Sequence, residues 1–234
     1  AAQPPLLPRP LSPAASSQPL RQLLQLRSAL VDGQPELSAA DSQLWEERVR
    51  GIASAYATPK AATGSPPRLS AGAEGPARPP TCGATLPSRV DADGPGLYIG
   101  DAASARDAEA LRALGIGAVM NCGAPAADYP PGFGHLLVRC EDTEGYPLLS
   151  RHLGECLAFG DVCESEGRGL LVHCVMGLNR SATLAVAMLM LRRGTLLLES
   201  VRCVWESRGR LPILTNSSFR RQLVQLAHLT GRLG

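Results

Sequence analysis

The sequence is poor in lysine, in aromatic residues and in long apolar runs. Lys60 is the only lysine, aromatic residues make up 4% of the chain, and the formal net charge is +2. This balance predicts neither a nucleic-acid partner nor a basic patch that would bind a membrane surface. No apolar run reaches the roughly 18 residues that a membrane-spanning helix needs, so we expect no membrane association.

The seven cysteines lack the pattern of a disulfide framework or of a zinc site. Their number is odd, no two of them form a C-x-x-C pair, and they are spread through apolar segments. We therefore expect a soluble chain in a reducing compartment, in the cytoplasm and also in the nucleus. Residues 1–31 contain arginine and serine but no acid, so an organellar transit peptide is the alternative. The cysteines are Cys82, Cys122, Cys140, Cys156, Cys163, Cys174 and Cys203.

The composition of the chain changes near residue 81, which divides an N-terminal extension, 1–81, from a domain at 82–234. The stretch 58–80 is rich in Pro, Gly, Ala and Ser and predicts a flexible linker, because it cannot bury enough apolar surface to offset its ordering. Apolar residues recur at helical spacing before it, in 20–31 and in 37–56, where Ser38 and Asp41 form a capping pair. These two amphipathic helices either dock on the main domain or form a docking element for a partner or a substrate.

The domain at 82–234 alternates strand and helix patterns. This alternation predicts an α/β fold, a central mostly parallel sheet with helices on both faces. The expected strands are 97–100, 116–122, 135–140 and 169–174, and the expected helices are 104–115, 148–167, 181–193, 196–207 and 217–232.

The segment 171–184 reads LVHCVMGLNRSATL and predicts a loop that binds an anion at the carboxyl end of a strand. The loop from Val175 to Asn179 can turn its backbone N–H groups inward, with Gly177 allowing a close approach. The helix that begins at Arg180 and Ser181 adds unpaired amides and the positive end of its dipole. The guanidinium of Arg180 can bind two oxygens of a phosphate at once.

The same positive field acts on Cys174, whose thiol we expect to be ionised and nucleophilic. His173 precedes it on the strand, and neighbouring side chains of a strand point to opposite faces, so its ring should not reach the sulfur. We therefore expect His173 to orient the loop by hydrogen bonding, without a proton transfer of its own.

The motif HCVMGLNRS at 173–181 resembles the H-C-x5-R-S/T signature of the protein tyrosine phosphatases, and its continuation SATLAVAMLM resembles the dual-specificity phosphatases. The resemblance covers about 88–234 and implies a small atypical dual-specificity phosphatase with the phosphatase-type α/β fold. It implies a metal-free, cofactor-free hydrolysis of phosphoprotein monoesters through a cysteinyl-phosphate. Further segments in family order are SRVD at 88–91, GLYIGDAASARD at 96–107, LGIGAVMNC at 114–122 and NSSFRRQL at 216–223.

The resemblance also implies a general acid on the loop after an earlier strand, where Asp142 precedes Thr143 in CEDTEGYPLL. Glu141 and Glu144 are competing acids, and Asp142 could instead cap a turn. Ser181 is expected to hydrogen-bond the departing sulfur in the second step; it could instead be a plain N-terminal helix cap, or have both roles. The stretch 212–216 is longer than the Pro-Asn pair that is usual in the family, which leaves any role for Asn216 doubtful.

The variable positions of the loop are Val175, Met176, Leu178 and Asn179, the last standing where many family members have serine. An uncharged rim favours a phosphorylated protein over a highly charged lipid or nucleotide. The expected partners are phosphoprotein substrates and protein kinases, while the oligomeric state stays open. Two rival functions remain: a pseudophosphatase that binds phosphoproteins as a scaffold, and a phosphatase of a non-protein substrate.

Overall fold

The computed structural model describes residues 37–55, 86–123, 129 and 131–234. The helix expected at 20–31 and the linker expected at 58–80 lie outside these residues. The elements are α2 (Ala39–Ala53), β1 (Ser88–Arg89), β2 (Leu97–Gly100), η1 (Ser104–Arg106), α3 (Ala108–Ala113), β3 (Ile116–Cys122), β4 (Gly134–Val138), α4 (Leu148–Ser165), β5 (Gly169–His173), α5 (Arg180–Met188), η2 (Leu189–Arg193), α6 (Leu197–Ser207) and α7 (Ser217–Leu229).

Within the described part of the chain, the sheet has five strands in the order β1-β2-β5-β3-β4, and the strands β2, β5, β3 and β4 run parallel. This confirms the mostly parallel sheet expected from the alternating pattern. The sequence did not predict β1, a two-residue strand that pairs antiparallel with β2. Such a short strand has too few residues to show a period of two.

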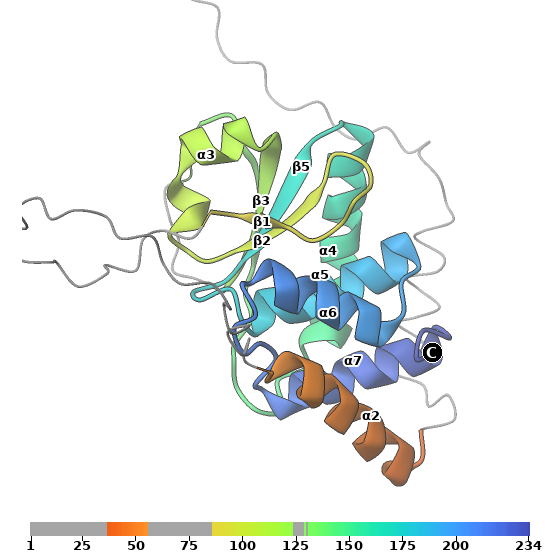
Figure 1. Ribbon diagram of the computed structural model, residues 1–234. Helices are drawn as coiled ribbons and strands as arrows, with labels where there is room; N and C mark the ends of the chain where they lie inside the picture. Colours follow the sequence, from red (N-terminus) through yellow and green to blue (C-terminus); the bar gives the residue numbers. More distant parts are fainter. Residues whose placement is uncertain (1–36, 56–85, 124–128, 130) are drawn as a thin grey trace, which may run out of the picture.

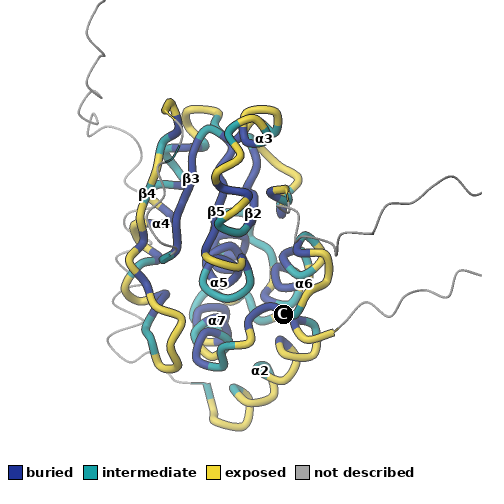
Figure 2. The backbone as a smooth tube through the Cα atoms, turned by 90° about the vertical axis from the view of Figure 1, so that its left-hand side faces the viewer, coloured by how far each residue is buried: buried dark blue, intermediate teal, exposed yellow. Residues whose placement is uncertain are grey.

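Helices cover both faces of the sheet, as the strand alternation requires (Figure 1). On β5, Leu170 and Val172 face the larger core, while Leu171 faces the smaller core beneath α3. The larger core lies between the sheet and the C-terminal helices, and α5 is its most deeply buried helix (Figure 2). Among the described residues, no helix combines the length and apolarity needed to cross a membrane.

The single helix expected at 104–115 is wrong in its start. Ser104 donates its backbone N–H to the carboxylate of Asp101, and this contact opens the short 3₁₀ helix η1. The α-helix α3 begins later, where the Asp107 side chain accepts the N–H of Ala110 and acts as its cap. The side-chain contacts of Asp101 and Asp107 with the backbone therefore divide the segment into two short helices, where the pattern predicts one.

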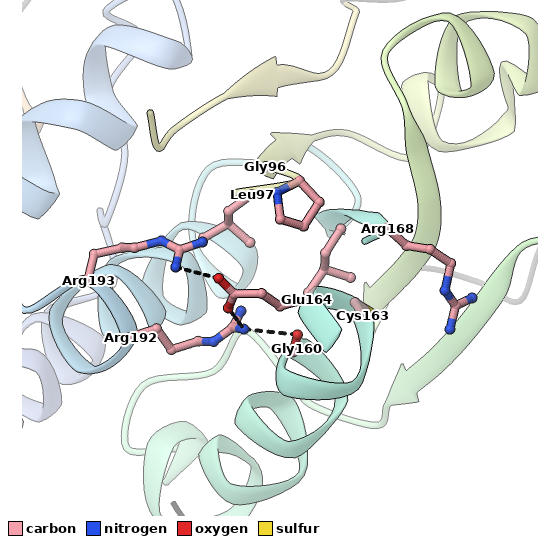
Figure 3. Close-up of a pocket in the computed structure, with 10 residues that line it drawn as sticks. Gly96, Leu97, Gly160, Cys163, Glu164, Arg168, Arg192 and Arg193 are labelled. Carbon is pink, nitrogen blue, oxygen red and sulfur yellow. Dashed lines mark hydrogen bonds and ion pairs between the residues drawn. The ribbon is translucent and has the colours of Figure 1, made fainter. Parts of the chain in front are cut away.

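The helix expected at 181–193 is α5 followed by a π-helical turn, η2, which ends at Gly194 with φ of +74°. The turn aims Arg192 and Arg193 back at α4, where both guanidinium groups bind the carboxylate of Glu164 (Figure 3). Arg193 also pairs with Asp91 at 3.1 Å, which ties the start of the domain to the same group. These ion pairs fix α4 against the helix that carries the candidate site.

Candidate active site

The loop predicted to bind an anion follows β5, which lies between β2 and β3 in the middle of the sheet. The loop connects His173, the last residue of β5, to Arg180, the first residue of α5. Ligand sites of parallel sheets lie at this carboxyl edge. The strand and the helix are both buried, so they hold the loop rigidly at its two ends.

The carbonyl groups of the loop point outward and are satisfied by donors around it. Val175 O accepts the N–H of Ala102 at 3.1 Å, and Leu178 O accepts the N–H of Leu214 at 2.9 Å. In a planar trans peptide the carbonyl of one residue and the N–H of the next point in opposite directions. The N–H groups that follow these carbonyls therefore face the inside of the loop, as expected for an anion site.

Gly177 adopts a conformation that other residues rarely reach, with φ of +72°. A side chain at this position would place its Cβ 2.4 Å from the carbonyl oxygen of Gly100. The glycine thus lets the loop pack against the end of β2. Its own N–H points inward and donates to Cys174 Sγ at 3.2 Å.

The sulfur of Cys174 lies at the floor of the loop and is almost completely buried. Ser181 Oγ donates a second hydrogen bond to it at 3.2 Å. Burial acts to raise the pKa of this thiol, but the hydrogen bonds from Ser181 and Gly177 and the charge of Arg180 outweigh burial and lower the pKa. The surroundings of Cys174 therefore favour its thiolate form over the form of an ordinary cysteine.

The other described cysteines behave in the opposite way. Burial raises the pKa of each of these thiols, and raises that of Cys140 to about 12. Low dielectric surroundings favour the neutral thiol unless donors and cations compensate. The loop thus distinguishes Cys174 from Cys122, Cys140, Cys156, Cys163 and Cys203.

Arg180 extends from the first position of α5 along the inside of the loop 174–180, which we call the cup. Its Nη1 donates to the carbonyl of Gly123 at 2.9 Å, which fixes the direction of the side chain. Its buried Nε has no hydrogen-bond partner among the described residues, and lies 3.9 Å from Asp142 Oδ2. An oriented guanidinium with a donor to spare suits an oxyanion ligand.

The structure places Asp142 next to Arg180, and thus at the cup, as the family resemblance implied. Asn216 Nδ2 donates to Asp142 Oδ1 and to the carbonyl of Thr143, both at 3.2 Å. The competing acid Glu144 instead binds Ser217 and Arg221 on α7. Of these two carboxylates, Asp142 is the one paired with the cup arginine.

His173 is buried beneath the loop and makes the kind of contact expected of it. Its Nδ1 lies 3.3 Å from the carbonyl of Cys174, and its Nε2 lies 2.9 Å from the hydroxyl of Tyr129. Burial lowers the pKa of His173 to about 4, so the ring is neutral at pH 7. Both ring nitrogens are thus engaged away from the sulfur of Cys174.

The rim of the loop is apolar. Val175 and Met176 are 46% and 65% exposed, which is high for side chains of this kind, and Leu178 is partly buried. The side chain of Asn179 hydrogen-bonds Thr215, so the part of Asn179 that can line the substrate site, as predicted for the N–H groups of 175–179, is its backbone. What Asn179 offers a ligand is its backbone N–H.

Two further residues at the site were not identified from the sequence. Arg208, at the end of α6, is buried and donates to the carbonyl of Met176 at 3.1 Å, with Asp101 Oδ2 at 3.9 Å. Asn216, left without a role in the sequence, holds Asp142 and also caps α7.

Ser181 is the second residue of α5 and Asn179 is the cap, so the plain helix-cap alternative for Ser181 is wrong.

The chain is similar to known proteins of one family. A model of the dual specificity phosphatase catalytic domain matches residues 97–228. Human dual specificity protein phosphatase 26 is 36% identical over 151 residues, which are 62% of this chain and 70% of that protein.

Two solved structures share the fold. The crystal structure of human DUSP28 has a TM-score of 0.54 and 26% identity, and the match covers 68% of this chain and 99% of that chain. A mouse putative dual specificity phosphatase complexed with zinc tungstate has a TM-score of 0.51 and 28% identity, over 68% of this chain and 94% of that chain. The catalytic-domain model covers more than half of this chain, so the chain belongs to the dual specificity phosphatase family.

Proposed function

We propose that this phosphatase hydrolyses phosphate monoesters on phosphotyrosine and on phosphoserine and phosphothreonine of proteins, through a cysteinyl-phosphate. The observation that supports this most is the sulfur of Cys174, which receives hydrogen bonds from Gly177 N and Ser181 Oγ beside the guanidinium of Arg180. A nucleophile and an oxyanion receptor thus occupy one loop.

In the first step, the Cys174 thiolate attacks phosphorus and forms the S–P bond while the P–O bond to the substrate breaks. Arg180 and the inward amides of the loop hold the phosphoryl oxygens, whose charge they balance in the transition state. Asp142, protonated at this stage, gives its proton to the leaving oxygen of the side chain. The products are the dephosphorylated protein and a phosphate bound to Cys174.

In the second step, the Asp142 carboxylate takes a proton from water while the water oxygen attacks phosphorus. The S–P bond breaks, inorganic phosphate leaves, and Cys174 returns to its thiolate. Ser181 stabilises this thiolate as it forms, because its hydroxyl already donates to Sγ at 3.2 Å. No metal or cofactor takes part in either step.

The apolar rim favours a phosphorylated protein. Val175 and Met176 are exposed, and they offer a peptide apolar contact without the extra cations that a polyphosphorylated lipid or nucleotide would need. We place the enzyme in the cytoplasm and nucleus, because a catalytic thiolate requires a reducing compartment. Its partners there are phosphoproteins and their kinases. The tungstate of the mouse relative is a tetrahedral dianion, the shape and charge that we assign to the ligand here.

The second candidate is a pseudophosphatase that binds phosphoproteins as a scaffold. A scaffold needs the anion receptor but not the ionised thiol or the acid. The lowered pKa of Cys174 and the pairing of Asp142 with Arg180 favour catalysis over binding alone.

The test is hydrolysis by the purified chain of three substrates at equal concentration without metal: a phosphotyrosyl peptide, a phosphothreonyl peptide and a phosphoinositide in vesicles. We expect turnover of both peptides and little turnover of the lipid, with all turnover lost in Cys174→Ser. Turnover of the lipid alone would favour the non-protein substrate, and binding of the peptides without release of phosphate would favour the scaffold.

A further inference from the structure

We propose that α2 is a positioning element of the active site, and that it acts through residues 211–216, which we call the coupling segment. This inference rests on the proposed phosphatase function. The matched catalytic domain begins at residue 97, so α2 lies outside it in the sequence. The structure nevertheless packs α2 against α6 and α7, close to the coupling segment that joins them (Figure 1).

The docking of α2 buries its apolar side. Val49 and Ala53 are fully buried in the larger core, and Trp45 packs against it. The carbonyl of Ala53, at the end of α2, accepts the N–H of Ile213 at 2.9 Å. The N-terminal helix therefore touches the coupling segment with a directed hydrogen bond as well as with apolar surface.

The next residues of the coupling segment bind the phosphate loop, residues 174–180, which forms the cup. Leu214 donates its N–H to the carbonyl of Leu178 at 2.9 Å. Thr215 donates its N–H to Asn179 Oδ1 at 2.8 Å, and its hydroxyl also contacts the Asn179 side chain. These bonds keep the Leu178 carbonyl outward and thus the following N–H inward, toward the anion.

The last residue of the coupling segment binds the loop 139–147, which carries Asp142 and which we call the acid loop. Asn216 Nδ2 donates to Asp142 Oδ1 and to Thr143 O, while its Oδ1 caps the N-terminus of α7. Four consecutive residues, 213–216, thus contact in order the end of α2, the phosphate loop and the side chain of Asp142 on the acid loop. A shift of the segment would move the nucleophile's loop and the acid together.

The backbone of the coupling segment depends on its neighbours for its shape. Leu214 has φ of +52°, a conformation that costs energy for a residue with a side chain and persists only where the surroundings hold it. Arg220 on α7 donates to the carbonyls of Leu214 and Thr215, at 2.6 and 2.9 Å. The Ala53 carbonyl completes this set of contacts, so undocking of α2 is expected to let the segment relax.

Val49→Arg in the full chain tests the proposal, because it places a charge in the buried contact of α2. The control is Gln43→Arg on the exposed side of the same helix. We expect Val49→Arg to lower kcat about tenfold for a phosphotyrosyl peptide, whose leaving group needs the acid, and clearly less for p-nitrophenyl phosphate, while KM changes little. Amide hydrogen exchange should speed up in 211–216 and in 174–180. The control should behave as the wild type.

Thr215→Val keeps the proposal testable if Val49→Arg does not fold. Thr215 is exposed, and the substitution removes only its hydroxyl contacts with Asn179. We expect a several-fold loss of kcat with an unchanged melting temperature, and Thr215→Ser should restore activity. A folded Val49→Arg or Thr215→Val protein with wild-type kcat and exchange would overturn the inference. Failure of the proposed function is recognised separately, as a wild-type chain whose activity does not depend on Cys174.

Discussion

Ser181 Oγ lies 3.2 Å from Cys174 Sγ and donates a hydrogen bond to it. The two residues are seven positions apart, at the two ends of the phosphate loop, so the bond closes the loop around the sulfur. Its effect on the pKa of Cys174 is to lower it, against the effect of burial. In the mechanism that we propose, the contact supports the thiolate of the resting enzyme and the departing sulfur of the second step.

Ser181→Ala is expected to raise the pKa of Cys174, because the thiolate loses a donor and its burial remains. The rate of alkylation by iodoacetate, measured against pH, should shift to higher pH, and kcat should fall about tenfold. The control is Thr183→Val, whose lost hydroxyl donates to Asn179 O rather than to the sulfur. An unchanged alkylation profile in Ser181→Ala would contradict the assignment.

Cys174→Ser is expected to lower kcat by about 10⁴-fold or more, because a serine hydroxyl is not ionised in this site. Binding of a phosphotyrosyl peptide should persist, since Arg180 and the loop amides remain. Calorimetry with the peptide, beside a turnover assay, measures both properties on the same sample. Residual turnover at the wild-type rate would exclude Cys174 as the nucleophile.

Asp142→Asn is expected to reduce kcat for a phosphotyrosyl peptide by about 10²-fold and to affect p-nitrophenyl phosphate much less, because a good leaving group needs little protonation. The matched control is Glu144→Gln on the same loop, which loses contacts to Ser217 and Arg221 only. If Glu144→Gln showed the larger, leaving-group-dependent loss, the acid would be Glu144 instead.

His173 is expected to make the stability of the protein depend on pH. Its pKa is about 4 in the folded chain against an ordinary value of 6.5, so the unfolded chain binds a proton more readily between these values. The free energy of unfolding should therefore decrease as the pH falls from 6.5 to 4, by about 3 kcal/mol from this group.

Urea unfolding of the wild type and of His173→Asn across this pH range measures the contribution of His173. The variant should show a smaller decrease, although its stability at pH 7 is lower because it loses the contacts with Tyr129 and Cys174 O. Equal decreases in the two proteins would contradict the neutral, buried state of the ring.

The main features of the fold and of the site could be predicted from the sequence because their signals are local. Strands β2, β3 and β5 are short apolar runs, and the loop from Cys174 to Ser181 shows its nucleophile, its glycine and its arginine within eight residues. Strand and helix flank this loop directly, so the pattern alone indicates that it lies at the carboxyl edge of the sheet.

The features that the sequence did not show depend on contacts between distant segments. In the sequence, nothing distinguishes Arg208 from a surface arginine. The packing of α6 against the loop brings its guanidinium to the carbonyl of Met176. Asn216 and Asp142 are 74 positions apart, and their pairing follows from the docking of α7. The capping of α3 by Asp107 was missed for a different reason, since the sequence pattern predicts one continuous helix over 104–115.

Detection of the phosphorylated enzyme is the direct test of Cys174 as the nucleophile. The wild-type chain and Ser181→Ala are mixed with a phosphotyrosyl peptide, quenched in acid within milliseconds, digested and analysed by mass spectrometry. We expect one phosphate on the peptide that contains Cys174, present in larger amount in Ser181→Ala because its breakdown is slower. Turnover with no phosphate on Cys174 at any time point, or with phosphate on another residue, would exclude the cysteinyl-phosphate.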